Sequence, residues 1–144
     1  MAAGIESPPP PPTPRNSTSH MIVGIGIDLI ECSRVERELS RAPWTADESV
    51  FTAEELRQCG GRNKVAQLSA CFAAKEAALK ALGAEAEDLG LLREVELLFG
   101  PTGSPQIVLR SRMQAKAKSL GVRRIWISIA SAKKHAGAAV VIES

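Results

Sequence analysis

Residues 64–83 read KVAQLSACFAAKEAALKALG, and this stretch predicts the central element of the fold. It is rich in Ala and Leu, which are strong helix formers, and Gly83 supplies a stop, so we expect a helix over about 64–82. From residue 66 onward only three of its residues are charged: Lys75, Glu76 and Lys80. A helix this apolar is buried over most of its surface, so each of these charges requires a partner.

An apolar, β-branched run lies before this helix in the chain. Residues 21–28 read MIVGIGID, which predicts a buried strand. Side chains alternate along a strand, so one face carries Val23, Ile25 and Ile27, and the other carries Ile22, Gly24, Gly26 and Asp28. The two glycines leave space on the face of Asp28, either for a closely packed helix or for a ligand.

The remaining pattern adds helices and hairpin-connected strands. Thr52-Ala53-Glu54-Glu55 has the form of a capping box and predicts the start of a second helix. Further helices are expected over about 33–40 and 111–120, and strands over 95–99, 106–110, 124–130 and 137–142. This order predicts an α+β fold with an antiparallel sheet packed on the long helix.

The N-terminal segment differs in composition from the rest. Six of the nine prolines lie within the first fourteen residues. We expect residues 1–20 to be a disordered, proline-rich tail, or residues left over from cloning, because Ser19-His20-Met21 is typical of a cloning junction. The remaining length predicts a single domain over residues 21–144.

Composition narrows the class of function. The net charge is only +2 and aromatic residues make up 3%, which argues against a nucleic-acid binder that relies on a basic stripe or on stacked rings. The three cysteines lack CxxC spacing, so neither a zinc site nor a disulfide framework is expected, and a reducing compartment, the cytoplasm, is favoured. No stretch is long and apolar enough to predict a membrane span.

Two carboxylates are candidates for a shared metal site. Mg²⁺ is usually held by one or two carboxylates, water molecules and substrate phosphate oxygens. Asp28 and Glu76 can line one cleft, with Lys80, one turn after Glu76, facing the same phosphates. The spacing also permits two simpler interpretations: Glu76 and Lys80 form an ordinary i,i+4 ion pair, and Asp28 is a helix cap or turn former.

Two motifs place these residues in a family. Residues 24–31, GIGIDLIE, resemble the opening motif of the holo-acyl-carrier-protein synthases, and residues 72–83, FAAKEAALKALG, resemble their most distinctive motif. Gly103-Ser104-Pro105 is similar to a Gly-x-Pro hairpin turn of the same family. The resemblance covers about residues 21–144 and implies the 4′-phosphopantetheinyl transferase fold of the small, trimeric type.

The resemblance also implies a reaction and the residues that perform it. The reaction is Mg²⁺-dependent transfer of 4′-phosphopantetheine from coenzyme A to a serine of apo-acyl carrier protein, which releases adenosine 3′,5′-bisphosphate and supports fatty acid or polyketide synthesis. Asp28 and Glu76 match the metal ligands, and Arg34 matches an arginine that meets the carrier protein. Coenzyme A contacts are implied at Lys80, Gly83, Pro105 and Ser128. Glu76 and Lys80 are the catalytic candidates, and either Glu76 or a water on the metal accepts the serine proton.

The chain departs from the family pattern in four places. Cys71 stands where the family usually has an arginine, and residues 84–88 replace a Thr-Gly-Ile loop. Ser104 stands where lysine is frequent, and Ser131 where the third motif often ends in histidine. These changes leave a competing interpretation open: a non-catalytic relative that binds carrier protein or forms a structural trimer.

Overall fold

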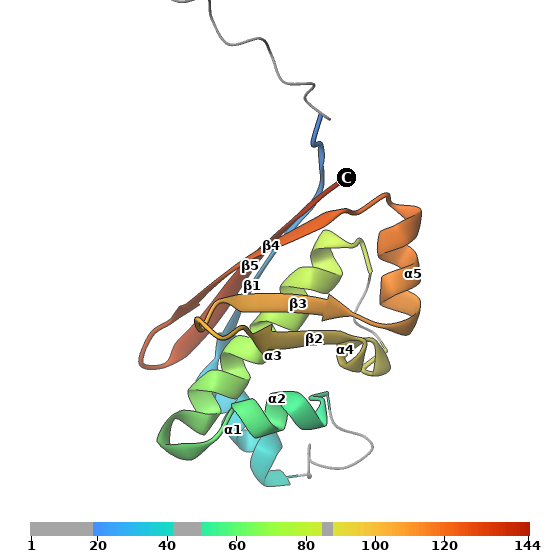
Figure 1. The fold of residues 1–144 in the computed structure, drawn as a ribbon. Helices are drawn as coiled ribbons and strands as arrows, with labels where there is room; N and C mark the ends of the chain where they lie inside the picture. The colour runs from blue at the N-terminus through green and yellow to red at the C-terminus, as the bar shows by residue number, and fades with distance from the viewer. Residues whose placement is uncertain (1–18, 42–49, 85–87) are drawn as a thin grey trace, which may run out of the picture.

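The computed structural model describes residues 19–41, 50–84 and 88–144, which form two antiparallel sheets with one long helix between them (Figure 1). The elements in chain order are β1 (Ile22–Glu31), α1 (Cys32–Arg41), α2 (Ala53–Gln58), a 3₁₀ turn η1 (Gly61–Asn63), α3 (Lys64–Ala81), α4 (Gly90–Arg93), β2 (Val95–Phe99), β3 (Pro105–Leu109), α5 (Ser111–Ser119), β4 (Arg124–Ser131) and β5 (His135–Glu143). The predicted α+β class is confirmed.

The strands fall into two separate sheets. One has three strands in the order β1-β5-β4, and each neighbouring pair is antiparallel. The other is the β2-β3 hairpin. The helix α3 packs against β1 and β5 on one side and against β2 on the other, so it forms the centre of the core (Figure 1).

The long helix ends where its sequence predicts. Leu82 caps α3, and Gly83 follows with a φ of +64°, a conformation that residues with a Cβ rarely adopt. Between Leu68 and Ala81 every residue is buried except Glu76 and Lys80. After its first turn, α3 therefore presents only these two side chains to its surroundings outside the core.

The glycines of β1 allow the strand to pack closely against α3. A Cβ added to Gly26 would lie 1.9 Å from the carbonyl oxygen of Ala77, and one added to Gly24 would lie 2.0 Å from that of Ala81. Only glycine permits so close an approach of strand to helix. The space that the two glycines leave on the Asp28 face is thus filled by α3 and not by a ligand.

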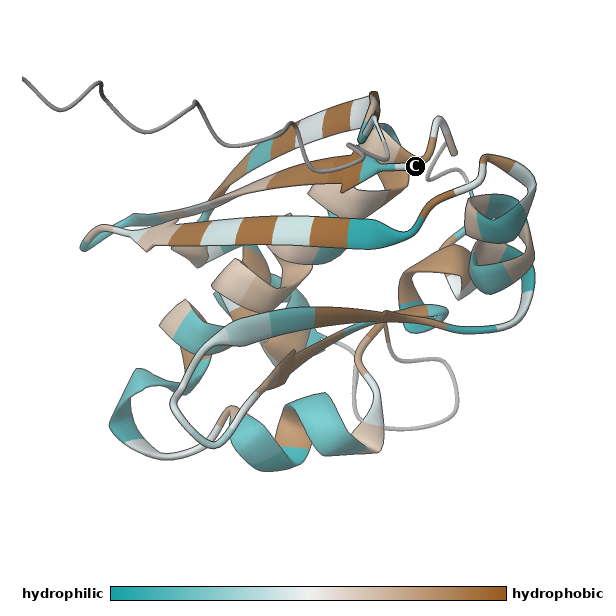
Figure 2. Ribbon diagram, turned by 45° about the horizontal axis from the view of Figure 1, so that its top comes forward, coloured by the Kyte–Doolittle hydropathy of each residue, from teal (hydrophilic) through white to brown (hydrophobic). Residues whose placement is uncertain are grey.

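The other face of β1 is open, so the prediction of a buried strand is wrong for that face. Ile25, Ile27 and Leu29 are 65%, 70% and 71% exposed. Trp126 of β4, which lies in the same row as Ile25 across β5, is 52% exposed. Figure 2 shows that hydropathy alternates along β4. The isoleucines on either side of Trp126 and beyond, Ile125, Ile127 and Ile129, pack against the core. We call this surface the open sheet face.

Two short elements were not predicted, because η1 and α4 span only three and four residues and cannot display a helical period. The strand β1 also runs three residues beyond the predicted end, since its pairing with β5 continues to Glu31 opposite His135. The capping box at Thr52 is present as predicted. Within the described ranges, no helix has the length and hydrophobicity of a membrane span.

Candidate active site

The packing of α3 on β1 brings Lys80 to Asp28. The Nζ atom of Lys80 lies 2.8 Å from Oδ1 of Asp28 and donates a second hydrogen bond to the carbonyl oxygen of Ile27 at 3.1 Å. Among the described residues the salt-bridge partner of Lys80 is Asp28, so the simpler i,i+4 pair with Glu76 is not the one that forms. The Lys80 side chain is 52% exposed, so solvent reaches this pair.

Glu76 lies one helical turn before Lys80 and is half-buried. Burial raises the pKa of its carboxyl group, and the negative charge of Asp28 raises it further, while the positive charges of Lys80 and Arg34 act in the opposite direction. Glu76 is therefore within electrostatic range of all three. We call these four residues the open charge cluster: Asp28, Arg34, Glu76 and Lys80.

The open charge cluster has donor atoms that suit Mg²⁺. This ion prefers carboxylate oxygens, and the mutual repulsion of Asp28 and Glu76 is the kind of strain that a divalent cation relieves. In the described part of the chain, no group of three or more His, Cys, Asp or Glu side chains is placed to hold a metal. Water and phosphate oxygens would therefore complete the coordination, which is usual for Mg²⁺.

Arg34 reaches the cluster from α1. Its guanidinium carbon lies 5.8 Å from the centre of the Phe72 ring on α3, within the range of a cation–π contact. The start of α1 is held at the end of the sheet, because the backbone N–H of Cys32 donates to the carbonyl oxygen of Lys134 at 2.8 Å. The exposed Arg34 thus lies at the rim of the cluster.

Gly83 lies at the same end of α3 as Lys80. Its carbonyl oxygen accepts a hydrogen bond from Nζ of Lys116 on α5 at 3.2 Å. This contact ties α5 to the C-terminus of α3. The predicted coenzyme A residues Lys80 and Gly83 therefore lie within one turn of each other.

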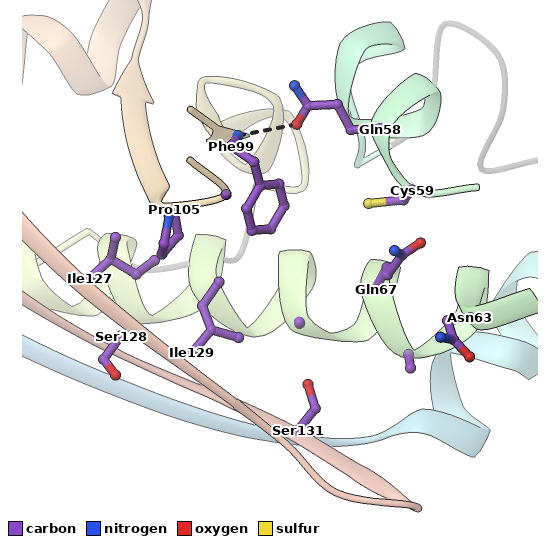
Figure 3. A pocket seen from close by; sticks show the side chains of 13 residues that line it. Gln58, Cys59, Asn63, Gln67, Phe99, Pro105, Ile127, Ser128, Ile129 and Ser131 are labelled. Carbon is purple, nitrogen blue, oxygen red and sulfur yellow. Dashed lines mark hydrogen bonds between the residues drawn. The ribbon is translucent and has the colours of Figure 1, made fainter. Parts of the chain in front are cut away.

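Pro105 and Ser128 lie elsewhere in the chain. Both line a cavity of about 920 Å³ between the first half of α3, the tip of the β2-β3 hairpin and β4 (Figure 3). Its walls also include Gln58, Phe99 and Ile129, but no member of the open charge cluster. A single chain thus holds the predicted coenzyme A residues in two separate places.

Comparison with known proteins identifies the family. Residues 24–139 match the model of the 4′-phosphopantetheinyl transferase superfamily. The chain belongs to this superfamily. It is 36% identical over 123 residues to the holo-[acyl-carrier-protein] synthase of Maridesulfovibrio salexigens, and the match covers 85% of this chain and 99% of that protein.

Solved structures of superfamily members share the fold. The holo-[acyl-carrier-protein] synthase of Neisseria meningitidis superimposes with a TM-score of 0.75 at 27% identity, covering 86% of this chain and all of that one. The Helicobacter pylori synthase in complex with coenzyme A gives a TM-score of 0.69 at 27% identity, covering 82% and 98%. The fold implied by the resemblance is therefore confirmed.

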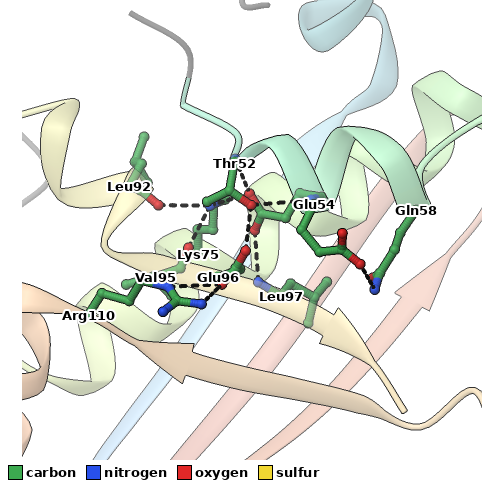
Figure 4. Close-up of polar contacts among 10 residues, drawn as sticks. Thr52, Glu54, Gln58, Lys75, Leu92, Val95, Glu96, Leu97 and Arg110 are labelled. Atoms are coloured by element: carbon green, nitrogen blue, oxygen red, sulfur yellow. Dashed lines mark hydrogen bonds and ion pairs between the residues drawn. The ribbon is translucent and has the colours of Figure 1, made fainter. Parts of the chain in front are cut away.

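One charged group of this superfamily member was only partly anticipated. Lys75 was expected to need a partner, and the structure supplies Glu55 of α2: the two side chains are fully buried and their charged atoms lie 2.7 Å apart (Figure 4). The capping box at Thr52 located Glu55 at a helix start but not beside α3. Spacing along the chain carries no signal for a pair twenty residues apart.

The departures from the family pattern fall in different surroundings. Cys71 is buried, and burial, followed by the charge of Glu55, raises the pKa of its thiol well above the ordinary value. It therefore lies in the core near Glu55 and does not face solvent. Of the replaced loop, residues 85–87 lie outside the described residues, and Asp88 forms an ion pair with Arg112 at 2.9 Å. Ser131 lines the same cavity as Ser128.

Proposed function

We propose that this chain is a holo-acyl-carrier-protein synthase. It transfers 4′-phosphopantetheine from coenzyme A to a serine of apo-acyl carrier protein and releases adenosine 3′,5′-bisphosphate. The observation that carries the proposal is the open charge cluster, with Lys80 bonded to Asp28 beside a Glu76 whose pKa is raised. Relatives with this activity in their name match over nearly their whole length, and one was solved with coenzyme A.

In this proposal Asp28 and Glu76 hold Mg²⁺, which when bound supplies positive charge to the diphosphate oxygens. Lys80 moves from Asp28 to the phosphate oxygens. Its side chain is half-exposed and so has room to move. In moving, Lys80 exchanges its ion pair with Asp28 and its hydrogen bond to the carbonyl oxygen of Ile27 for contacts with the phosphates. Its ammonium group then stabilises the charge that develops on the departing adenosine bisphosphate.

We assign Glu76 as the general base that accepts the proton of the serine hydroxyl. Its carboxylate is half-buried beside Asp28 in the open charge cluster, and a carboxylate within hydrogen-bond reach of the serine hydroxyl can act as its general base. The serine oxygen bonds to the phosphorus next to pantetheine, and the proton passes to the Glu76 carboxylate. The bond from that phosphorus to the bridging oxygen breaks, and the electron pair leaves with adenosine 3′,5′-bisphosphate.

We further propose that the active unit is a homotrimer with sites shared between subunits. The open sheet face supports this, because contiguous exposed apolar side chains mark interaction surfaces. Sharing also allows Pro105 and Ser128 of one subunit to meet the open charge cluster of the next. The variant Ile27→Glu tests this: native mass spectrometry should find a trimer in the original protein and monomers in the variant, with transfer lost as well.

Arg34 is proposed to meet the acidic carrier protein, because it is an exposed cation at the rim of the cluster. The transferase domain is taken as residues 21–144; residues 1–18 of the expected proline-rich tail lie outside the described residues. A cytoplasmic location fits the three cysteines, all of which are free. The product would serve fatty acid or polyketide synthesis.

One incubation tests the activity. Purified protein, coenzyme A, Mg²⁺ and apo-acyl carrier protein are combined, and intact-protein mass spectrometry detects the phosphopantetheine mass on the carrier. The variants Asp28→Ala and Glu76→Ala should each lose about 1,000-fold in rate, equivalent to about 4 kcal/mol, while remaining folded. The exposed control variant Glu54→Ala should keep full activity. Undiminished transfer by both site variants would remove these carboxylates from the reaction.

A second candidate is a non-catalytic relative that binds carrier protein. Cys71 and the replaced residues 84–88 favour it, since both differ from the family pattern. In the same incubation this candidate predicts a complex with the carrier protein and no added mass on it. The intact pairing of Asp28 with Lys80 favours the enzyme.

A further inference from the structure

A buried ion pair holds α3 on the side away from β1. The Nζ atom of Lys75 lies 2.7 Å from Oε2 of Glu55 and donates to the carbonyl oxygens of Leu92 at 2.8 Å and Val95 at 2.5 Å. An ammonium group has three donors and no acceptor, so every donor of Lys75 is used. Both charged side chains are fully buried, and their positions therefore depend on these contacts.

Glu55 is itself fixed by the backbone around it. Its Oε1 atom accepts a hydrogen bond from the N–H of Leu97 at 2.8 Å, and its Oε2 atom accepts one from the N–H of Thr52 at 2.8 Å (Figure 4). The backbone N–H of Glu55 donates in turn to Oγ1 of Thr52 at 3.2 Å. The carboxylate that anchors Lys75 is thereby tied to both β2 and the start of α2.

Close to Lys75 and Glu76, α3 has few other side-chain contacts that would hold its rotation about its own axis. Its large buried side chains lie about a turn or more away: Leu68, Phe72 and Leu79. The residues around Lys75 and Glu76 are mostly alanines, and the contact with β1 is one of backbone against backbone at Gly24 and Gly26. Small side chains provide few ridges to interlock. Directional contacts of a buried polar group are an established way to fix the register of such a helix.

We propose that the Glu55–Lys75 pair is a positioning device that fixes the rotation of α3 and so aims Glu76 at Asp28. Lys75 precedes Glu76 directly, about 100° around the helix, and Ala77 against Gly26 lies about 100° further on. Glu76 thus projects between two fixed points. Side chains reach about 5–6 Å from a helix axis, so a rotation of about 10° moves a carboxyl group by about 1 Å.

This inference rests on the proposed transfer reaction, in which a displacement of about 1 Å can cost about 100-fold in rate. The test is the double variant Glu55→Leu/Lys75→Met, because an apolar pair of similar volume often replaces a buried ion pair without loss of stability. We expect it to fold, to lose at least about tenfold in kcat, and to need several-fold more Mg²⁺ for half-maximal rate. The KM for carrier protein should stay the same, since Arg34 on α1 is not involved.

A gentler variant and a control complete the experiment. Glu55→Asp keeps the ion pair but withdraws the carboxylate, and it should shift kcat and the Mg²⁺ requirement in the same direction by a smaller factor. The control Glu54→Gln/Arg57→Gln removes an exposed ion pair from the same helix α2 and should change neither. The inference is overturned if either pair variant folds with unaltered kcat and Mg²⁺ dependence. It is also overturned if neither folds, since the pair would then be a requirement of the fold alone. Loss of transfer in the unmodified protein would instead refute the proposed function.

Discussion

Two of the lysines of α3, Lys75 and Lys80, differ in burial and in the partners of their ammonium groups. Lys75 is fully buried, and three acceptors satisfy its three donors. Lys80, five residues later, is half-exposed, and its ion pair with Asp28 is accessible to solvent. The first belongs to a closed network with Glu55, and the second to the open charge cluster.

The carboxylates of the two regions show the same contrast. Burial acts to raise the pKa of Glu96, in the network around Glu55, but hydrogen bonds from Thr52 and Arg110 outweigh it and the pKa is lowered. In the open cluster the pKa of Glu76 is raised, because burial and Asp28 outweigh Lys80 and Arg34. A charged group whose partners lie within the fold stabilises the fold. A charged group that lacks full compensation is available to bind a metal and a substrate.

The largest effect on stability should follow from breaking the closed network. Lys75→Met leaves the Glu55 carboxylate buried without its cation, and removing one partner of a buried pair typically costs about 3–5 kcal/mol. Urea denaturation should show this loss in the unfolding free energy. Adding Glu55→Leu to the same chain should recover most of this loss, and a Lys75→Met variant as stable as the parent would show that the buried pair does not stabilise the fold.

The contact that brings α3 to the open cluster should be nearly as sensitive. Gly26→Ala places a methyl group 1.9 Å from the backbone oxygen of Ala77, which cannot move aside, so we expect a loss of about 3 kcal/mol and impaired transfer. The matched control is Gly60→Ala, where nothing lies within 4 Å and φ is negative. Equal unfolding midpoints for the two variants would show that strand and helix are not in close contact.

Substitution of Lys80 should affect activity more than stability, the opposite of what is expected for Lys75. Lys80→Met removes an exposed ion pair, so the unfolding free energy should change by less than about 1 kcal/mol. The loss of its charge near the phosphates should lower kcat/KM for coenzyme A by about 10–100-fold. Steady-state kinetics against the exposed control Lys118→Met checks this, and a variant that is active but unstable would place Lys80 in the structural group instead.

The smallest effect concerns pH. The folded protein binds the proton of Glu76 more tightly than the unfolded chain, so without metal stability falls as pH rises from the ordinary value of 4.5 through the raised pKa. Glu76→Gln removes this penalty and should be more stable than the parent at pH 8, by less than about 1 kcal/mol for a group this exposed. The difference should vanish at pH 4. Thermal unfolding of the variant and the parent at pH 8 and pH 4 measures this difference. A Glu76→Gln variant whose stability relative to the parent is lower at pH 8 than at pH 4 would contradict the expected sign.

Local patterns were reliable where the determining interactions are local. The limits of α3, its stop at Gly83 and the capping box at Thr52 all follow from residues within a few positions of one another. Asp28, Glu76 and Lys80 were expected to line one cleft, but the ion pair between Lys80 and Asp28, 52 positions apart, was not predicted; the spacing had suggested a pair between Lys80 and Glu76. The partner of Lys75 and the open face of β1 were not identified.

The sequence by itself determined which residues carry charge on an otherwise apolar helix, and that a strand cleared by two glycines ends at an aspartate. Only the tertiary structure decided that the glycines admit the helix, that Lys75 is neutralised inside and Lys80 is not, and that one face of the sheet is left uncovered. The physical reason is that periodicity sets the direction of a side chain relative to its own helix or strand. Whether a distant segment or water lies in that direction, and which segment it is, depends on how the whole chain packs.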